Sequence, residues 1–189
     1  MNPPIVEIIK TIPSFAELLN RDDLLSDDRN VTNAFFKETV HQNNGVTDYL
    51  FRYRRPSTNE GTDSKAYLIL QLDKGVTGQA HIAHGGFLAT VMDEVTGGLV
   101  GATGIDNGHG MFTLSMKLEY LKPVYAPGTI MAVAGIAKRE GRKVFLDAYI
   151  KDNCGDICTK AEKATPVWYL DDISVVIGKA RLKLGIFEN

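Results

Sequence analysis

Hydrophobic and polar residues alternate along the second half of the chain with the period of two that is typical of β-strands. In "SMKLEY", Met116, Leu118 and Tyr120 fall on one face of such a strand, whereas Lys117 and Glu119 fall on the other. Comparable strand-like runs cover residues 66–72, 111–124, 128–140, 143–153 and 156–170. Short segments rich in turn-forming residues join the last four runs, so the pattern predicts consecutive antiparallel strands.

A different pattern occupies residues 85–102. Apolar side chains spread here around most of a helical circumference, which predicts a long helix buried on nearly every side. One stripe of this helix is small or polar instead, and it consists of Gly86, Thr90, Asp93 and Gly97. Because a single long helix precedes a series of antiparallel strands, the sequence predicts an α+β domain.

The rest of the chain divides around this domain. Residues 1–44 predict an N-terminal helical extension, in which Ser14 and Glu17 have the spacing of a capping box. The domain itself is expected over residues 45–170, with a polar, turn-rich loop at 54–65. Residues 171–189 are expected to form a C-terminal tail.

Composition and charge exclude several classes of function. The chain has 189 residues, of which 44% are hydrophobic, and its net charge of −2 gives no sign of a nucleic-acid-binding surface. No apolar run approaches the ~20 residues that would span a bilayer. The N-terminus has neither a signal-peptide core nor the Arg-rich character of a transit peptide, which predicts a cytoplasmic location, with a mitochondrial location as the alternative. Cys154 and Cys158 are expected to be reduced thiols, because no second cluster completes a metal site.

Asp93 is the unexpected residue of the helix. A carboxylate among apolar neighbours costs several kcal/mol unless it is hydrogen-bonded, paired or protonated. One interpretation is that Asp93 faces solvent or pairs locally, as expected for Glu94. The other is a functional acid, whose proton affinity is raised by desolvation and limited by hydrogen bonds from groups such as Thr113.

The helix begins at "HGG", residues 84–86, which favours the functional interpretation. Unpaired N–H groups and a partial positive charge mark the start of a helix. Glycines at this position let a carbonyl oxygen approach the amides, which is the requirement for an oxyanion hole. His84 is expected to orient a ligand or cap the helix, and a structural histidine is the alternative.

Three segments together resemble the hotdog-fold acyl-CoA thioesterases. "AHGGFLATVMDEVTGG" (83–98) is similar to the helix signature of the branch that includes phenylacetyl-CoA-type enzymes and mitochondrial long-chain acyl-CoA thioesterases. Its acid follows the histidine by nine positions, as in the family. "FTLSMKLEYLKPV" (112–124) and "REGRKVFLDAYI" (139–150) resemble the strand and hairpin that follow. The resemblance implies a hotdog fold, an antiparallel sheet wrapped around one central helix, over about residues 66–170.

The resemblance also implies a reaction and the residues that perform it. Asp93 matches the family's general base or nucleophile, and Thr113 matches a residue that positions water or supports the acid. Gly85 matches the amide that polarises the thioester carbonyl, with His84 beside it. The implied reaction is hydrolysis of acyl-CoA to free acid and CoA, a step of lipid metabolism that needs no cofactor because CoA is part of the substrate.

Binding of the substrate is implied at a second group of residues, namely Gly86, Lys122, Arg142 and Lys143. Two departures from the family leave the choice of substrate open. Gly78 stands where some members carry Asn or Gln, with Gln79 next to it, and the loop at 104–110 is longer than usual. Acyl length, aromatic preference and the choice between CoA and a carrier protein remain open.

The reaction and assembly leave alternatives to compare. A hotdog dehydratase would act on hydroxyacyl thioesters, but its Asp/His dyad is not evident, and a non-catalytic acyl-thioester-binding module is the other alternative. Gly85 and Asp93 are separated by about 12 Å along the helix axis, too far to act on one thioester within one chain. We therefore expect a homodimer in which two antiparallel helices share each site. Such dimers commonly pair into tetramers in this family.

Overall fold

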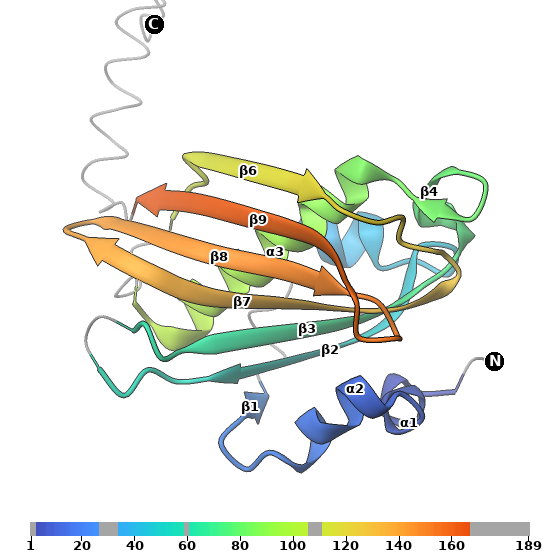
Figure 1. The fold of residues 1–189 in the computed structure, drawn as a ribbon, viewed down its shortest axis with the longest axis horizontal. Coiled ribbons are helices and arrows are strands. Elements are labelled where there is room, and N and C mark those ends of the chain that lie inside the picture. The colour runs from blue at the N-terminus through green and yellow to red at the C-terminus, as the bar shows by residue number, and fades with distance from the viewer. Residues whose placement is uncertain (1–2, 27–33, 59–60, 106–110, 167–189) are drawn as a thin grey trace, which may run out of the picture.

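A curved antiparallel sheet lies against one long helix in the computed structural model of the protein, which describes residues 3–26, 34–58, 61–105 and 111–166 (Figure 1). The sheet has seven strands in the order β1-β2-β3-β7-β8-β9-β6, and every neighbouring pair is antiparallel. The helix is α3 (Gly85–Thr103), and its strongest contacts with the sheet are to β7, β3 and β8. This is the expected α+β hotdog arrangement.

The elements have the following bounds. The sheet strands are β1 (Leu25–Ser26), β2 (Val46–Arg54), β3 (Lys65–Leu72), β6 (Ser115–Tyr120), β7 (Gly128–Glu140), β8 (Lys143–Lys151) and β9 (Ile157–Pro166). A separate two-stranded sheet consists of β4 (Thr77–Gln79) and β5 (Ile82–Ala83). The smaller helices are α1 (Ile5–Lys10), α2 (Pro13–Ala16), η1 (Glu17–Asn20), η2 (Phe36–Val40) and η3 (Lys74–Val76). The predicted tail at 171–189 and most of the loop at 104–110 lie outside the described residues.

The inner face of the sheet and α3 form the main core. Leu68 and Leu70 of β3 and Ala132 and Ala134 of β7 are buried against the helix, since alternate side chains of a strand point to one face. A Cβ added at Gly98 would lie 3.0 Å from the ring of Phe51, so a glycine here lets the helix approach β2 closely. The helix ends at Gly104, whose φ of +69° suits a residue without a side chain.

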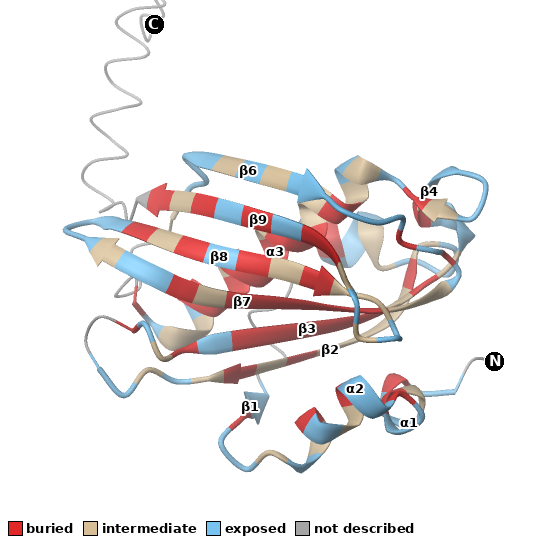
Figure 2. Cartoon of the chain, in the orientation of Figure 1, coloured by how far each residue is buried: buried red, intermediate tan, exposed pale blue. Residues whose placement is uncertain are grey.

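The N-terminal helices pack on part of the opposite face of the sheet, mainly on β3 and β7, and they leave β6 and β9 uncovered there (Figure 2). Strand residues that alternate with the inward-facing ones point to this outer face. Together with α1 and α2 they form a second apolar cluster. Its buried members are Ile5, Ile9, Ile12, Phe15, Leu18, Leu24, Tyr67, Ile69, Met131 and Val133. The predicted capping box is wrong, because Ile12 and not Ser14 is the N-cap residue of α2. Ser14 follows Pro13 in the first turn of this helix.

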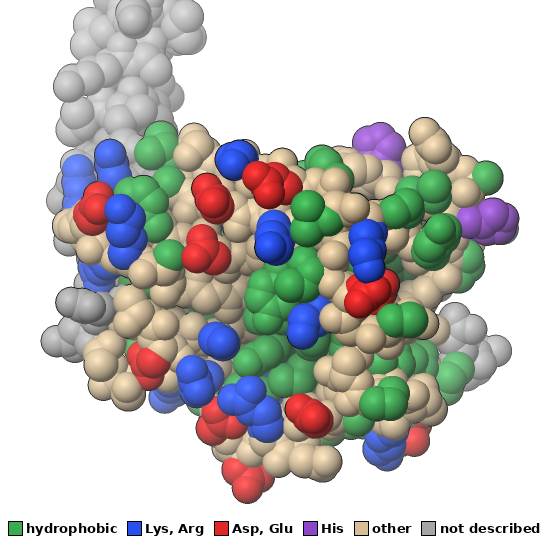
Figure 3. Space-filling view, viewed as in Figure 1, with side chains coloured by type: hydrophobic (Ala, Val, Ile, Leu, Met, Phe, Trp, Pro, Cys, Tyr) green, Lys and Arg blue, Asp and Glu red, His purple; other side chains and the backbone are tan. Residues whose placement is uncertain are grey.

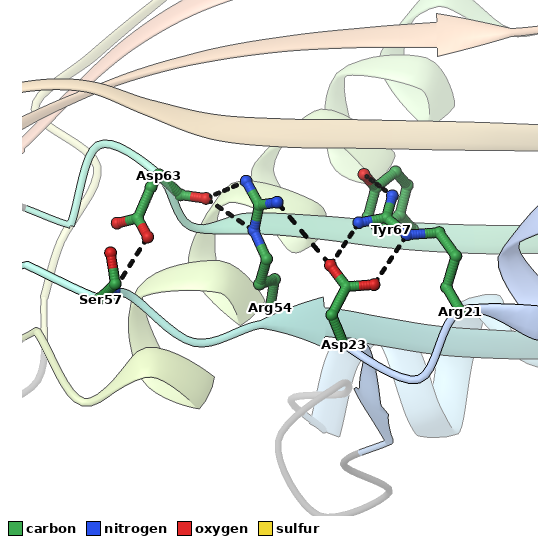
Figure 4. Close-up of polar contacts among 6 residues, drawn as sticks. All are labelled: Arg21, Asp23, Arg54, Ser57, Asp63 and Tyr67. Carbon is green, nitrogen blue, oxygen red and sulfur yellow. Dashed lines mark hydrogen bonds and ion pairs between the residues drawn. The ribbon is translucent and has the colours of Figure 1, made fainter.

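Polar contacts fasten the chain that leaves these helices to the sheet (Figure 4). Arg21 forms an ion pair of 2.5 Å with Asp23 and donates a 3.1 Å hydrogen bond to the hydroxyl of Tyr67 on β3. Arg54 of β2 lies 3.7 Å from the Asp23 carboxylate and donates to the carbonyl oxygen of Asp63. These contacts hold residues 21–23 in place across the edge of the sheet.

No helix among the described residues is both long and apolar enough to cross a membrane.

Candidate active site

Asp93 lies at the middle of α3, where two side chains from distant parts of the chain meet one of its oxygens. Its Oδ1 accepts a 2.7 Å hydrogen bond from Thr113 Oγ1 and a 2.7 Å charged hydrogen bond from Lys163 Nζ. Thr113 precedes β6 and Lys163 is on β9, and the pairing of these strands brings the two residues together. A backbone bond of 3.0 Å from Leu114 to Ala164 holds this end of the pair.

The sequence analysis missed Lys163. Its side chain is only 3% exposed, and its ammonium group also donates a 3.0 Å hydrogen bond to Thr96 Oγ1, one turn further along the helix. A signal was present in the sequence, because Lys163 shares its strand face with Thr159, Ala161 and Thr165, all of them buried. A lysine at an inward position of a strand requires a partner, but the partner is 70 residues away.

Opposing effects set the ionisation of Asp93. Burial raises the pKa of its carboxyl, whereas hydrogen bonds from Lys163 and Thr113, together with the positive charge of Lys163, lower it. The lowering effects win, and the pKa of Asp93 lies below the ordinary value. The sequence did not predict this lowering of the Asp93 pKa, because desolvation was expected to raise the proton affinity of the carboxyl and the contact with Lys163 was not foreseen. Asp93 is therefore a carboxylate at neutral pH.

A small cavity of about 250 Å³ adjoins this carboxylate. Its lining residues come from the second half of α3, from the segment before β6 and from β9, and they are Asp93, Glu94, Gly97, Gly98, Met111, Thr113 and Lys163. Among the described residues, the Asp93 Oδ2 atom receives no hydrogen bond, and the side chain is 47% exposed. One carboxylate oxygen is thus held and the other is available to a ligand.

The start of α3 forms a separate structure around His84. Nδ1 of His84 accepts a 2.9 Å hydrogen bond from the Gly86 N–H, which makes His84 the N-cap residue, as one of the two expectations had it. This occupies the Gly86 amide. A Cβ at Gly78 would lie 2.7 Å from His84 Cδ2, so the family's Asn or Gln at this position would displace the histidine.

Gly85 is the first residue of the helix, and its amide therefore has no acceptor within the helix. Its carbonyl oxygen accepts a 2.9 Å hydrogen bond from the hydroxyl of Tyr120 at the end of β6, a contact that the sequence did not indicate. A second cavity of about 550 Å³ opens here, and Gln79, His84, Gly85 and Tyr120 are among its lining residues. It shares no lining residue with the cavity at Asp93.

The predicted phosphate-binding residues are not gathered in one chain. Lys122 follows β6 and forms an ion pair of 2.6 Å with Asp156, both side chains being exposed. Arg142 is in the turn between β7 and β8, and Lys143 is the first residue of β8, where it pairs with Pro166 of β9. Tyr120, two residues before Lys122, pairs instead with Thr159 at the other end of β9. The two groups therefore lie at opposite ends of the sheet.

The outward face of β6, β8 and β9 carries both signs of charge, as Figure 3 shows. Lys117 and Glu119 form an ion pair of 3.0 Å there, and a hollow of about 270 Å³ between the strands is lined by Lys160 and Glu162 among others. This mixture gives the face no single-sign patch.

The cysteines do not contribute to either cavity. Cys154 is exposed and Cys158 is buried, and both are free thiols. Burial raises the pKa of the Cys158 thiol to about 11, so it is protonated and unreactive at neutral pH. Within the described part of the chain, no cluster of three or more His, Cys, Asp or Glu side chains has the arrangement of a metal site.

An antiparallel sheet wrapped around one central helix is the hotdog fold. Residues 80–159 match the family model of the thioesterase superfamily, and this confirms the family resemblance recognised in the sequence. Among curated proteins, the acyl-coenzyme A thioesterase THEM4 of Xenopus laevis is 24% identical over 145 residues. The match covers 76% of this chain and 60% of that protein.

Solved structures agree on the fold. A thioesterase related to phenylacetic acid degradation from Ralstonia eutropha superposes with a TM-score of 0.50 at 22% identity, covering 55% of this chain and 76% of that one. A thioesterase from Streptococcus pneumoniae, solved with coenzyme A, gives 0.51 at 20% identity, with coverages of 57% and 84%. These similarities establish the hotdog fold.

Proposed function

We propose that the protein hydrolyses acyl-CoA thioesters to a free acid and CoA. One observation carries this proposal: a carboxylate at the middle of the central helix lines a cavity and is fixed through Oδ1, while no described residue donates a hydrogen bond to its Oδ2. The relatives support it by name, since the Xenopus protein is an acyl-coenzyme A thioesterase and the pneumococcal structure holds coenzyme A.

Asp93 would act on the carbonyl carbon of the thioester. In one route its Oδ2 accepts a proton from a water molecule as that water attacks the carbon. In the other, Oδ2 attacks the carbon directly and displaces CoA as its thiolate, and water then hydrolyses the resulting mixed anhydride to the free acid and restores the Asp93 carboxylate. In both routes the developing oxyanion needs a donor, and the Gly85 amide is the proposed one.

Gly85 and Asp93 of a single chain cannot serve the same thioester. About 12 Å of helix axis separates them, and they line different cavities. A second copy would solve this if two α3 helices ran antiparallel. In support, a Cβ placed at Gly97 or Gly101 would meet no atom of the described residues within 4 Å, so this stripe of the helix faces open space.

The edge of the sheet supports the same homodimer. β6 is the edge strand next to β9, and large apolar side chains are exposed on it and around it. They are Phe112, Leu114, Tyr120, Leu121 and Tyr125, each at least 50% exposed. Antiparallel pairing of β6 with its copy would cover them. It would also bring Lys122 of one chain toward Arg142 and Lys143 of the other, as one CoA phosphate site requires.

A panel of acyl-CoAs tests the proposed function by release of the CoA thiol. We expect turnover of several acyl chains by the wild-type protein and its loss in Asp93→Asn. Hydration of enoyl-CoA without thiol release would identify the dehydratase instead, and tight binding without turnover would identify a binding module. We also propose a cytoplasmic location and a division of the chain into an N-terminal extension (1–44), a catalytic domain (45–170) and a C-terminal tail (171–189).

A further inference from the structure

We infer that Lys163 is a positioning residue for the reaction, which holds Asp93 by Oδ1 so that Oδ2 is the oxygen that reacts. The inference rests on the proposed function, in which Asp93 acts on a thioester. It goes beyond that function because it assigns a role to a buried cation that neither the sequence motifs nor the family match includes.

The contacts of Lys163 are directed at Asp93 from one side. Its Nζ lies 2.7 Å from Asp93 Oδ1, 3.5 Å from the Asp93 carbonyl oxygen and 3.0 Å from Thr96 Oγ1. The Thr96 hydroxyl donates to the helix carbonyls of Met92 and Asp93, so its oxygen is available to accept from the lysine. All three acceptors lie within one turn of α3, which fixes the ammonium group relative to the carboxylate.

Burial makes this arrangement costly without a partner. Lys163 is 3% exposed in its side chain, whereas Lys160 on the same strand points to the outer face and is exposed. A buried ammonium is strongly disfavoured unless it is paired. Because an apolar side chain would fill the same space at lower cost, the lysine at this position indicates a requirement for charge beside Asp93.

The contacts of Lys163 determine which oxygen of Asp93 can react and favour the ionised form of this carboxyl. Thr113 and Lys163 both occupy Oδ1, so the attacking water or the thioester carbon meets Oδ2. Among the described residues, the charged or titratable groups that line the cavity beside this carboxylate are Lys163 from β9 and Glu94 from the same helix. Lys163 lowers the pKa of the Asp93 carboxyl, which partial burial alone would raise.

The matched test replaces two lysines of β9. Lys163→Met removes the inward charge and keeps an unbranched side chain, while Lys160→Met makes the same change on the outer face. The acidic limb of kcat/KM against pH would be measured on an acyl-CoA that the wild type hydrolyses. The Asp93 carboxyl would be titrated separately by carbon-13 NMR. Lys163→Met removes an opposite charge beside Asp93. The acidic limb of kcat/KM and the NMR titration of the Asp93 carboxyl should therefore both move to higher pH, by about 1–3 units. Lys160→Met should match the wild type.

A uniform loss of kcat at every pH, with the acidic limb and the Asp93 titration unmoved, would overturn the inference, because that is the result of a purely structural role. If Lys163→Met does not fold, Lys163→Gln serves instead, since its amide keeps a neutral donor; the same upward direction is expected with a smaller shift. A wild-type protein that releases no thiol from any acyl-CoA would refute the proposed function, and the NMR titration would still decide whether Lys163 controls Asp93.

Discussion

The hydroxyl of Tyr120 is bonded to the carbonyl oxygen of Gly85 at 2.9 Å, which ties the end of the edge strand β6 to the first residue of the central helix. The other end of β6 is tied to the same helix through Thr113 and Asp93. Gly85 and Asp93 of one chain, which would serve two different centres of the proposed dimer, are thus both tied to its β6, and any movement of this strand would move both.

Replacing Asp93 with Asn tests the acid. The change keeps the shape of the side chain and removes its capacity to accept a proton, so turnover should fall by about 10²–10⁴-fold. Steady-state kinetics on an acyl-CoA measures it, with circular dichroism and acyl-CoA binding as controls for the fold. Near-normal kcat in a folded Asp93→Asn protein would remove Asp93 from the reaction.

Thr113→Ala should be milder than Asp93→Asn. The threonine donates one of the two hydrogen bonds that hold Oδ1, and Lys163 retains the other. The measurement is kcat of the two variants under the same conditions. A Thr113→Ala protein less active than Asp93→Asn would show that the threonine, rather than the acid, makes the essential contact.

Arg142→Ala should weaken substrate binding. A cation that contacts the CoA phosphates contributes mainly to binding, so KM should rise more than kcat falls, and the effect should be larger at low salt. A short acyl thioester without the nucleotide should be unaffected, and Lys160→Met serves as the control for loss of a surface charge. Equal losses on both substrates would assign Arg142 a role in the fold or the chemistry.

A shared site predicts complementation between two inactive variants. Gly85→Pro deletes the amide donor but suits the helix, because proline is favoured at the first helical position and His84 already has an extended conformation (φ −65°, ψ 135°). Mixed with Asp93→Asn and refolded, half of the dimers would be mixed, each with one intact site, so about a quarter of wild-type activity should return. Mixed dimers isolated by two tags and devoid of activity would rule out the shared site.

Phe15→Ala tests how much the second hydrophobic cluster contributes to the free energy of unfolding. Phe15 is fully buried between the N-terminal helices and the outer sheet face, and its truncation should cost about 3–5 kcal/mol of unfolding free energy. Phe35→Ala, at a position 54% exposed, is the matched control and should cost far less. Urea unfolding measures both. Similar stabilities of the two variants would mean that the helices do not dock on the sheet.

The sequence predicted the elements whose patterns are regular and missed those whose patterns are interrupted. The expected strands at 66–72, 128–140 and 143–153 correspond closely to β3, β7 and β8, and the helix over 85–102 corresponds to α3. β2 was missed because a bulge between Val46 and Asp48 shifts its register, so the alternation breaks near its start. The expected strand at 111–124 is shorter in the structure, where β6 covers Ser115–Tyr120.

The site was predictable as far as local spacing reaches. Asp93 and the residues 84–86 are in one segment, and Thr113 followed from the family pattern. Lys163 could not be predicted as a site residue. Its role depends on the pairing of β6 with β9 and on the burial of one face of β9, and a local pattern specifies neither. The separation of Lys122 from Arg142 likewise required the strand register.

The N-terminal helices have a consequence for the number of subunits. They occupy the apolar half of the sheet face opposite α3, around Tyr67, Ile69, Met131 and Val133. A hotdog dimer whose outer faces were bare could stack on another dimer there, whereas this chain has already supplied its own cover. The expected stoichiometry is therefore two rather than four, and deletion of residues 1–26 should drive further self-association, visible by analytical ultracentrifugation. Dimers alone after such a deletion would show that residues 3–26 do not limit assembly.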